Sequence, residues 1–285
     1  MKKKILIIGS KGMAGHVIYH YFKSLSDFDV VDISRDDAFF TSSYKADATD
    51  THALTRIFAE EKPDIVINGI GVLNKDAEDN PDKAVFLNSY FPHFLARQGT
   101  EKGFKLIHIS TDCVFNGKKG HYTEGDVKDG FGFYAQSKAL GEVNYGPHLT
   151  IRTSIIGPEL KNNGIGLFHW FMHQKGEIKG YQKVFWSGVT TIELAKAIEK
   201  MVENNVTGLY HLVNPPINKF DLLTLFKRVY QKDSTTIHPY DDYFSDKSLI
   251  NTRTDVLHYH VPDYPTMIEE MKTWMLHHSK MYRSY

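Results

Sequence analysis

The feature that most constrains the fold is the start of the chain, where a short apolar run is followed at once by evenly spaced glycines. Residues 4–8 read KILII, a β-branched run of the kind that is buried on both faces of a parallel sheet. Gly9, Gly12 and Gly15 follow, and residues 14–25 carry helical periodicity. Backbone amides at a helix N-terminus can hold a pyrophosphate, and glycine lets the chain approach it closely. Strand, glycine turn and helix in this order therefore predict a dinucleotide-binding α/β domain.

The end of the next predicted strand, residues 29–33, indicates which dinucleotide binds. An acidic residue there binds the 2′-hydroxyl of NAD, whereas a small polar residue followed by arginine accepts the 2′-phosphate of NADP. The chain has Ser34 and Arg35, which favours NADPH. NADH stays open, because Asp32 would be the ribose ligand if the strand ended one or two residues earlier. Arg35 could equally be a solvated charge.

The segment from there to residue 99 continues the alternation of helix and strand. Asp47 lies in KADATD, which we place near the adenine, with a helix cap as the alternative. A helix is predicted over 51–61, and residues 64–69 form a strand whose glycine-containing turn would pass beneath the cofactor. A helix over 81–99 carries Asn88.

Residues 106–142 carry the predicted chemistry. A buried strand over 106–110 leads to Thr111, and after a glycine-rich loop Tyr134 and Lys138 open a helix. Positions four apart share a helix face, so these two side chains point the same way. A nearby ammonium stabilises a phenolate and lowers the tyrosine pKa. The pattern indicates a proton-donating site, although such a pair alone is common on ordinary helices.

Composition excludes several classes of protein. The 285 residues are 41% hydrophobic and 24% charged, as in a soluble globular chain, and Lys+Arg and Asp+Glu both total 34, so no basic field favours nucleic acid or membranes. A lone cysteine, Cys113, suits a reducing cytoplasm. No stretch reaches the ~20 apolar residues of a membrane span. Adjacent His277 and His278 share a helix face poorly, so no metal site is expected.

The chain after residue 149 is less regular. A strand is predicted over 149–155, and residues 162–187 are rich in glycine and aromatic side chains that could wrap a sugar or stack on a base. Trp170 and Trp186 are the candidates, with core packing as the alternative for each. The later elements that we predict are a helix over 192–204, a strand over 208–213, a helix over 220–231, a surface loop over 240–246 and a helix over 264–278.

Five segments occur in the order found in extended short-chain dehydrogenases/reductases: GSKGMAG, KPDIVINGIG, STDCVFNG, YAQSKALGE and IRTSIIG. Within that superfamily the chain resembles the dTDP-4-dehydrorhamnose reductases, which reduce a 4-keto group on a nucleotide-linked 6-deoxysugar. The resemblance covers residues 3–160 well. Cys113 departs from it, since the family usually has tyrosine there, and the last 50 residues follow no pattern of the family.

The resemblance implies a Rossmann-type doubly wound parallel sheet in residues 1–160. Residues 161–285 would form a smaller C-terminal substrate-binding lobe, with residues 190–213 returning to the sheet. NADPH would reduce the sugar carbonyl while Tyr134 donates a proton, Lys138 holds the nicotinamide ribose and Thr111 hydrogen-bonds the carbonyl oxygen. Asp112 would orient its loop beside the substrate. The expected cofactor-binding residues are Gly9, Lys11, Gly12, Met13, Gly15, Ser34, Arg35, Asp47, Ala48, Asn68, Gly69, Ile70, Tyr134 and Lys138.

Alternatives remain at this stage. An epimerase or dehydratase could share the fold, but a dehydratase needs an added acid and base, and Asp112-Cys113 supplies no Asp-Glu pair. A non-catalytic NADP-binding regulatory subunit is the rival from another class, against which Thr111, Tyr134 and Lys138 argue. The sequence leaves open which sugar and which nucleotide are bound, and the oligomeric state, for which a homodimer is one option. The product is expected to be used for cell-surface polysaccharides.

Overall fold

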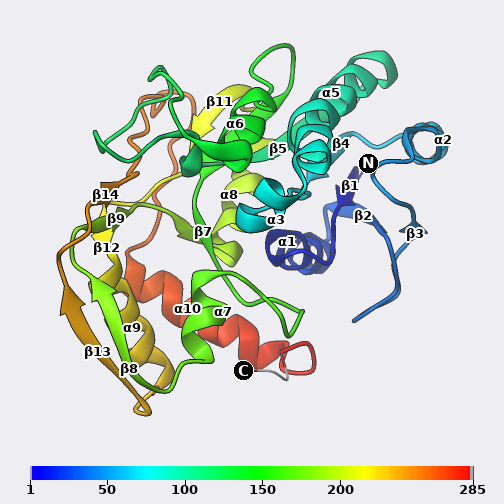
Figure 1. Ribbon diagram of the computed structural model, residues 1–285. Helices are drawn as coiled ribbons and strands as arrows, with labels where there is room; N and C mark the ends of the chain where they lie inside the picture. Colours follow the sequence, from blue (N-terminus) through cyan, green and yellow to red (C-terminus); the bar gives the residue numbers. More distant parts are fainter. Residues whose placement is uncertain (1, 283–284) are drawn as a thin grey trace.

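The computed structural model describes residues 2–282 and 285, and a parallel seven-stranded sheet forms its centre (Figure 1). The strand order is β11-β6-β5-β4-β1-β2-β3, which is the expected doubly wound sheet. The strands are β1 (Lys3–Ile8), β2 (Phe28–Ser34), β3 (Tyr44–Lys45), β4 (Ile65–Asn68), β5 (Lys105–Thr111), β6 (Leu149–Thr153) and β11 (Gly208–His211).

Both faces of the sheet are covered, which explains the continuously apolar strands. Side chains alternate along a strand, so Ile5 and Ile7 enter one core, whereas Leu6 and Ile8 enter the other. Helices α1 (Met13–Ser24) and α8 (Thr191–Glu203) pack together on the first face. Helices α2 (Thr51–Glu61) and α5 (Phe91–Lys102) cover the second. Helix α6 (Gly132–Leu140) lies beside the carboxyl end of β5.

The predicted helix over 81–99 is a continuous path of three segments. It begins as α4 (Pro81–Ala84), widens into the π-helical η1 (Val85–Tyr90) and continues as α5. The prediction missed the π segment, whose wider turn carries Asn88 inward. Asn88 is fully buried, and it accepts from the Val72 amide at 2.8 Å and donates to the Ser137 hydroxyl at 3.0 Å. This side chain thus ties the loop after β4 to α6 and is not solvated.

The C-terminal part forms a smaller lobe whose core is continuous with the first face of the sheet. Its elements are β7 (Ile155–Ile156), α7 (Leu167–Met172), β8 (Gly176–Tyr181), β9 (Val184–Trp186), β10 (Val189–Thr190), β12 (Ile217–Asn218), α9 (Lys219–Tyr230), β13 (Thr235–Tyr240), β14 (Ser245–Asp246) and α10 (Tyr264–His277). The surface loop predicted over 240–246 was too long, because Tyr240 ends β13 and Ser245 begins β14, which pairs with β9. The domain boundary at residue 160 stays a prediction.

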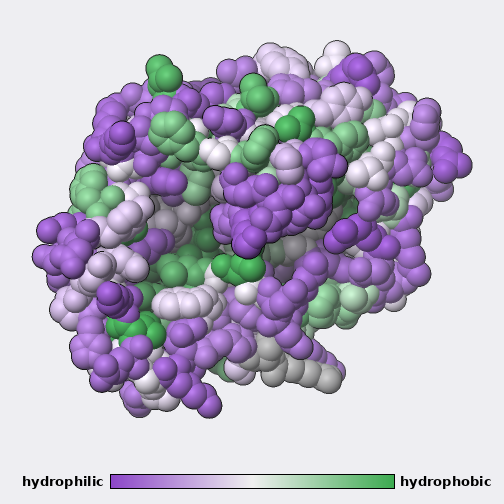
Figure 2. Space-filling model, in the orientation of Figure 1, coloured by the Kyte–Doolittle hydropathy of each residue, from purple (hydrophilic) through white to green (hydrophobic). Residues whose placement is uncertain are grey.

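The strand order reverses between β1 and β4, and in sheets of this type ligands bind outside the carboxyl ends of the strands at such a point. A short polar helix, α3 (Asn74–Asp79), follows β4 there. Figure 2 shows the surface hollowed beside this polar helix, with apolar residues at the bottom of the hollow. Among the described residues, the structure contains no helix with the length and apolarity needed to cross a membrane.

Candidate active site

The glycine turn connects the carboxyl end of β1 to α1. Gly9 has a φ of +84°, which glycine adopts without strain, and the Gly12 amide donates to the Gly9 carbonyl at 3.0 Å. A Cβ on Gly15 would stand 2.1 Å from the Gly9 carbonyl oxygen. The helix can therefore begin at Met13, close to the end of the strand. This cradle fits the pyrophosphate of a dinucleotide.

Polar side chains surround the end of β2 as the sequence predicts. The strand runs to Ser34, whose buried hydroxyl hydrogen-bonds Ser42 at 2.7 Å. Arg35 follows and is exposed. Lys11, from the glycine turn, is buried and donates to the Asp36 carbonyl oxygen. Two cations thus flank this strand end, an arrangement that suits the 2′-phosphate of NADP.

Asp32, the alternative ribose ligand, is fully buried. Its carboxylate accepts from the Ser10 hydroxyl at 2.5 Å and from the amide and hydroxyl of Ser43 at 2.8 and 3.0 Å. The alternative also required a shorter strand, whereas β2 extends two residues past Asp32. The structure therefore disfavours Asp32 as a cofactor ligand.

The segment expected near the adenine lies close to Arg35. Asp47 accepts from the amide and hydroxyl of Thr49 at 2.8 and 2.7 Å, and these bonds, together with Arg35, hold the pKa of its carboxyl below the usual range. Ala48 is buried. The cap of α2 is Asp50, which accepts from the Ala53 amide at 2.9 Å, so the helix-cap alternative for Asp47 is wrong.

The turn after β4 packs beneath the glycine turn. A Cβ on Gly9 would stand 2.8 Å from Ile70 Cγ1, and one on Gly69 would stand 3.6 Å from Gly15 Cα. Asn68 is fully buried and accepts from the Ile70 amide at 3.1 Å. The three residues Asn68, Gly69 and Ile70 therefore line the point where the strand order reverses.

Tyr134 and Lys138 lie on one face of α6, next to the end of β5. Tyr134 lines a cavity of about 340 Å³ that also receives Cys113 and Lys247. Glu78 of α3 accepts from the Tyr134 amide at 3.2 Å and so holds the first turn of α6 at the edge of this cavity. The other residues that line the cavity are Asn74, Glu78, Phe115, Asn116, Phe131 and Ala135.

The charges at this site differ from the sequence expectation in one respect. Burial raises the pKa of Tyr134, as does the nearby Cys113, and only the contact with the Thr111 side chain opposes the rise. The ammonium of Lys138 is buried and donates to the Ile109 carbonyl at 2.7 Å. Burial lowers the pKa of Lys138 to about 8. The pKa of Tyr134 is therefore raised and not lowered as expected, and the Lys138 ammonium bonds the Ile109 carbonyl of the strand.

Thr111 and Asp112 close the other side of the site. The Thr111 hydroxyl donates to Asp112 Oδ1 and accepts from the Cys113 amide, both at 3.1 Å. Burial raises the pKa of Asp112, while Lys247 and Lys219 act in the opposite direction. Sequence reasoning missed these two lysines, because both are far from Asp112 in sequence. Lys219 begins α9, and Lys247 follows β14.

The two candidate tryptophans lie in different environments. Trp186 is 3% exposed and belongs to the main core, where its ring packs on Tyr264 and lies 5.2 Å from the ammonium of Lys219. Trp170 is 40% exposed on α7. Burial favours the core alternative for Trp186, whereas a contact of Trp170 with the substrate stays a prediction.

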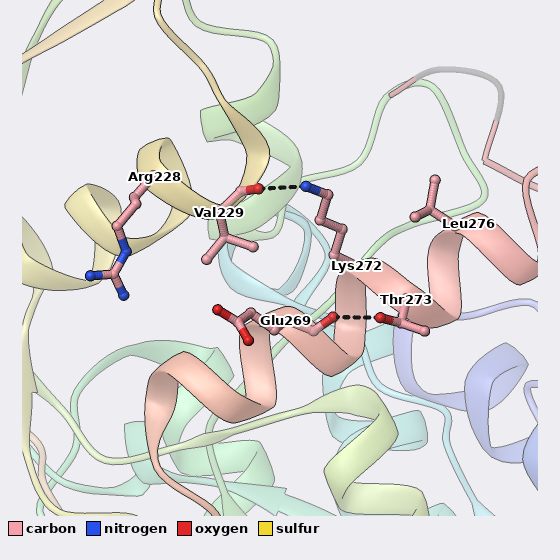
Figure 3. A pocket seen from close by; sticks show the side chains of 6 residues that line it. All are labelled: Arg228, Val229, Glu269, Lys272, Thr273 and Leu276. Carbon is pink, nitrogen blue, oxygen red and sulfur yellow. Dashed lines mark hydrogen bonds between the residues drawn. The ribbon is translucent and has the colours of Figure 1, made fainter.

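A larger depression of about 510 Å³ lies between α9 and α10 and is lined by Arg228, Val229, Glu269, Lys272, Thr273 and Leu276 (Figure 3). The Lys272 ammonium donates to the Val229 carbonyl at 2.8 Å and the Thr273 hydroxyl to the Glu269 carbonyl at 3.0 Å. It lies in the C-terminal lobe, apart from α6 (Figure 1), so it does not contribute to the Tyr134 site.

The chain is similar to proteins of one family. The family model described as RmlD substrate binding domain matches residues 2–248. The dTDP-4-dehydrorhamnose reductase of Burkholderia thailandensis is 32% identical over 226 residues, which are 74% of this chain and 72% of that protein. The spore coat polysaccharide biosynthesis protein SpsK of Bacillus subtilis is 28% identical over 220 residues, 75% and 74% of the two chains.

A solved structure with the same fold is that of the dTDP-4-dehydrorhamnose reductase of Bacillus anthracis in complex with NADP. Its TM-score is 0.81 at 20% identity, and the alignment covers 96% of this chain and all of the other. The agreement extends the shared fold through the C-terminal lobe, where the sequence pattern is weakest.

Proposed function

Because the chain belongs to the family of the RmlD substrate binding domain, we propose that it is an NADPH-dependent reductase of a 4-keto group on a nucleotide-linked 6-deoxysugar. The observation that carries the proposal is that Tyr134 and Lys138 lie on one face of α6 against the end of β5. The Thr111 side chain contacts Tyr134 there, and the Ile109 carbonyl accepts from Lys138. The products would serve cell-surface polysaccharides, and the lone Cys113 and the use of NADPH suit the cytoplasm.

NADPH, when bound, supplies a hydride to the carbonyl carbon. Tyr134 then donates its phenolic proton to the developing alkoxide, and the high pKa that burial gives this phenol keeps it protonated until that moment. The Thr111 hydroxyl, now donating to Asp112, can turn to hydrogen-bond the same oxygen. Lys138 offers its remaining N–H groups to the cofactor ribose.

The cofactor side rests on Gly9, Gly12 and Gly15, with Arg35 and Lys11 near the 2′-phosphate. Gly69 and Ile70 would lie beneath the cofactor, and Asp47 and Ala48 would border its adenine. Each of these assignments is supported by the positions described above. The substrate would lie in the hollow between this half and residues 161–285 (Figure 2).

The charge of the cavity supports a nucleotide diphosphate as the carrier of the sugar. Burial lowers the pKa of Lys219 to about 8, with Asp112 opposing, and Lys247 lines the cavity beside Tyr134. In the residues that the structure describes, no hydrogen bond or ion pair engages either ammonium within the protein. Their positive charge would be matched by the diphosphate.

The test is to mix the protein with NADPH and a panel of dTDP-, UDP- and GDP-linked 4-ketosugars and to follow the loss of NADPH absorbance. Oxidation of NADPH with one nucleotide series is expected. An epimerase would instead convert sugar without net oxidation of NADPH, and a non-catalytic subunit would bind NADPH without turnover. Either result would reject the reductase.

A further inference from the structure

Beneath Lys138, a buried histidine and a buried asparagine form a chain of contacts that leads away from the active site. His108 of β5 is fully buried, and its Nε2 lies 3.5 Å from the Lys138 Nζ. Its Nδ1 lies 3.1 Å from the Nδ2 of Asn68 on the neighbouring strand. The register of the sheet pairs Asn68 with His108 directly, so the two side chains are held side by side.

The position of the His108 proton follows from these contacts. The Asn68 amide oxygen accepts from the Ile70 backbone N–H at 3.1 Å, and because a backbone amide can only donate, the orientation of the Asn68 side chain is fixed. Its NH₂ group must therefore donate to His108 Nδ1. Burial lowers the pKa of His108 well below its usual value, so the ring is neutral and carries one proton. That proton lies on Nε2, which faces Lys138.

The distances agree with this assignment. The Lys138 ammonium lies 2.7 Å from the Ile109 carbonyl oxygen, which accepts, but 3.5 Å from His108 Nε2. Two donors facing each other keep such a separation, whereas an accepting nitrogen would allow a normal bond near ~2.9 Å.

We propose that Asn68 and His108 are positioning residues for Lys138: Asn68 fixes the His108 proton on Nε2, and that N–H opposes an ammonium but offers a hydrogen bond to an amine. The role given to Lys138 rests on the proposed function, whereas the position of the histidine proton does not. Through this contact the sheet favours loss of a proton from Lys138 at moderately alkaline pH. While Lys138 is still an ammonium, the same contact directs its hydrogens to Ile109 and to the cofactor side.

Few other charged groups face Lys138. Glu142, just after the end of α6, favours the ammonium, but its carboxylate is bound by Arg152 at 2.8 and 2.7 Å and by Lys128 at 3.1 Å. Tyr134 shares the helix face. The charge of His93 on α5 contributes to lowering the pKa of His108. His108 is therefore the group whose replacement should move the titration of Lys138 with the smallest change in charge.

The first experiment reads the histidine tautomer directly. Long-range ¹⁵N–¹H spectra of the folded protein, with histidine rings labelled, distinguish Nε2–H from Nδ1–H, and the signal of His108 is assigned by its loss in His108→Gln. We expect Nε2–H at neutral pH. A His108 signal of the Nδ1–H form overturns the proposal, and this reading needs neither cofactor nor substrate.

The second experiment measures the Kd of NADPH against pH for wild type and His108→Leu. In the wild type, affinity should fall as pH rises through about 8, where Lys138 loses its charge. His108→Leu should move this midpoint upward by about one pH unit. The matched control is His148→Leu, another buried histidine bonded to β5, through the Leu106 amide at 3.1 Å.

The control should lose stability but keep the wild-type midpoint. A midpoint unchanged in folded His108→Leu would contradict the proposal and leave the reductase assignment standing. Absence of NADPH binding in the wild type would instead count against the proposed function.

Discussion

Arg152 and Glu142 form a fully buried, bidentate ion pair, with Nε to Oε1 at 2.8 Å and Nη2 to Oε2 at 2.7 Å. Glu142 also accepts from the Ser110 hydroxyl at 2.8 Å, next to Thr111. Burial alone would raise the pKa of Glu142, but Arg152 holds it below its usual value. The pair therefore fastens the segment that follows α6, which carries Tyr134, to β6, and the bond from Ser110 ties the same carboxylate to β5.

The first prediction concerns this pair. Arg152→Met should lower the free energy of unfolding by about 3–5 kcal/mol, because the buried Glu142 carboxylate loses both bonds from Arg152 and keeps only those from Lys128 and Ser110. The double variant Arg152→Met with Glu142→Gln should recover part of that loss. Denaturant unfolding curves measure both. Equal losses in the single and double variants would show that the pair is not the source of the effect.

The second prediction concerns the proton donor. Tyr134→Phe removes only the hydroxyl, so turnover should fall about 10²–10⁴-fold while the Kd of NADPH changes little. Tyr145→Phe is the control, since that exposed phenol hydrogen-bonds His93 at 2.7 Å. Steady-state kinetics and cofactor titration decide it, and a Tyr134→Phe enzyme that keeps most of its turnover would exclude Tyr134 as the acid.

The third prediction is that Arg35 contributes to the preference for NADPH over NADH. Arg35→Ala should narrow the preference by about ten- to a hundredfold, because a charge-assisted bond to a phosphate in an open site contributes at most a few kcal/mol. Fluorescence titration with both cofactors measures the change. Arg56→Ala, an exposed arginine on α2, should leave the preference as it is. Equal wild-type affinities for NADPH and NADH would contradict this prediction.

The sequence predicted those parts of the site that depend on local pattern. The glycine turn, the end of β2 and the Tyr134–Lys138 pair follow from spacing within one strand or helix. The contacts of His108 and the buried pair of Glu142 and Arg152 did not follow, because they depend on the register between strands. The sequence also could not show that the Lys138 ammonium is bound to Ile109, since that depends on how α6 sits against β5.

The fourth prediction concerns Lys247, which enters the cavity from the C-terminal lobe. Lys247→Met should raise the KM for the nucleotide-sugar about tenfold and change kcat little, because its charge would act on the diphosphate in ground and transition states alike. Lys183→Met is the control, since that exposed lysine pairs with Asp241 at 3.5 Å. An equal effect of both variants would point to long-range charge and not to a contact.

The last prediction separates the two tryptophans. Trp186→Ala should lower the free energy of unfolding by about 3–5 kcal/mol, because its buried ring packs on Tyr264 in the main core. Trp170→Ala, at an exposed ring on α7, should change stability little and raise the KM for substrate if α7 borders the sugar. Melting temperature and kinetics, measured together on each variant, distinguish these effects. A Trp170→Ala enzyme with unchanged KM would remove α7 from the substrate site and leave the cavity beside Tyr134 and Lys247 as the place to search for the sugar contacts.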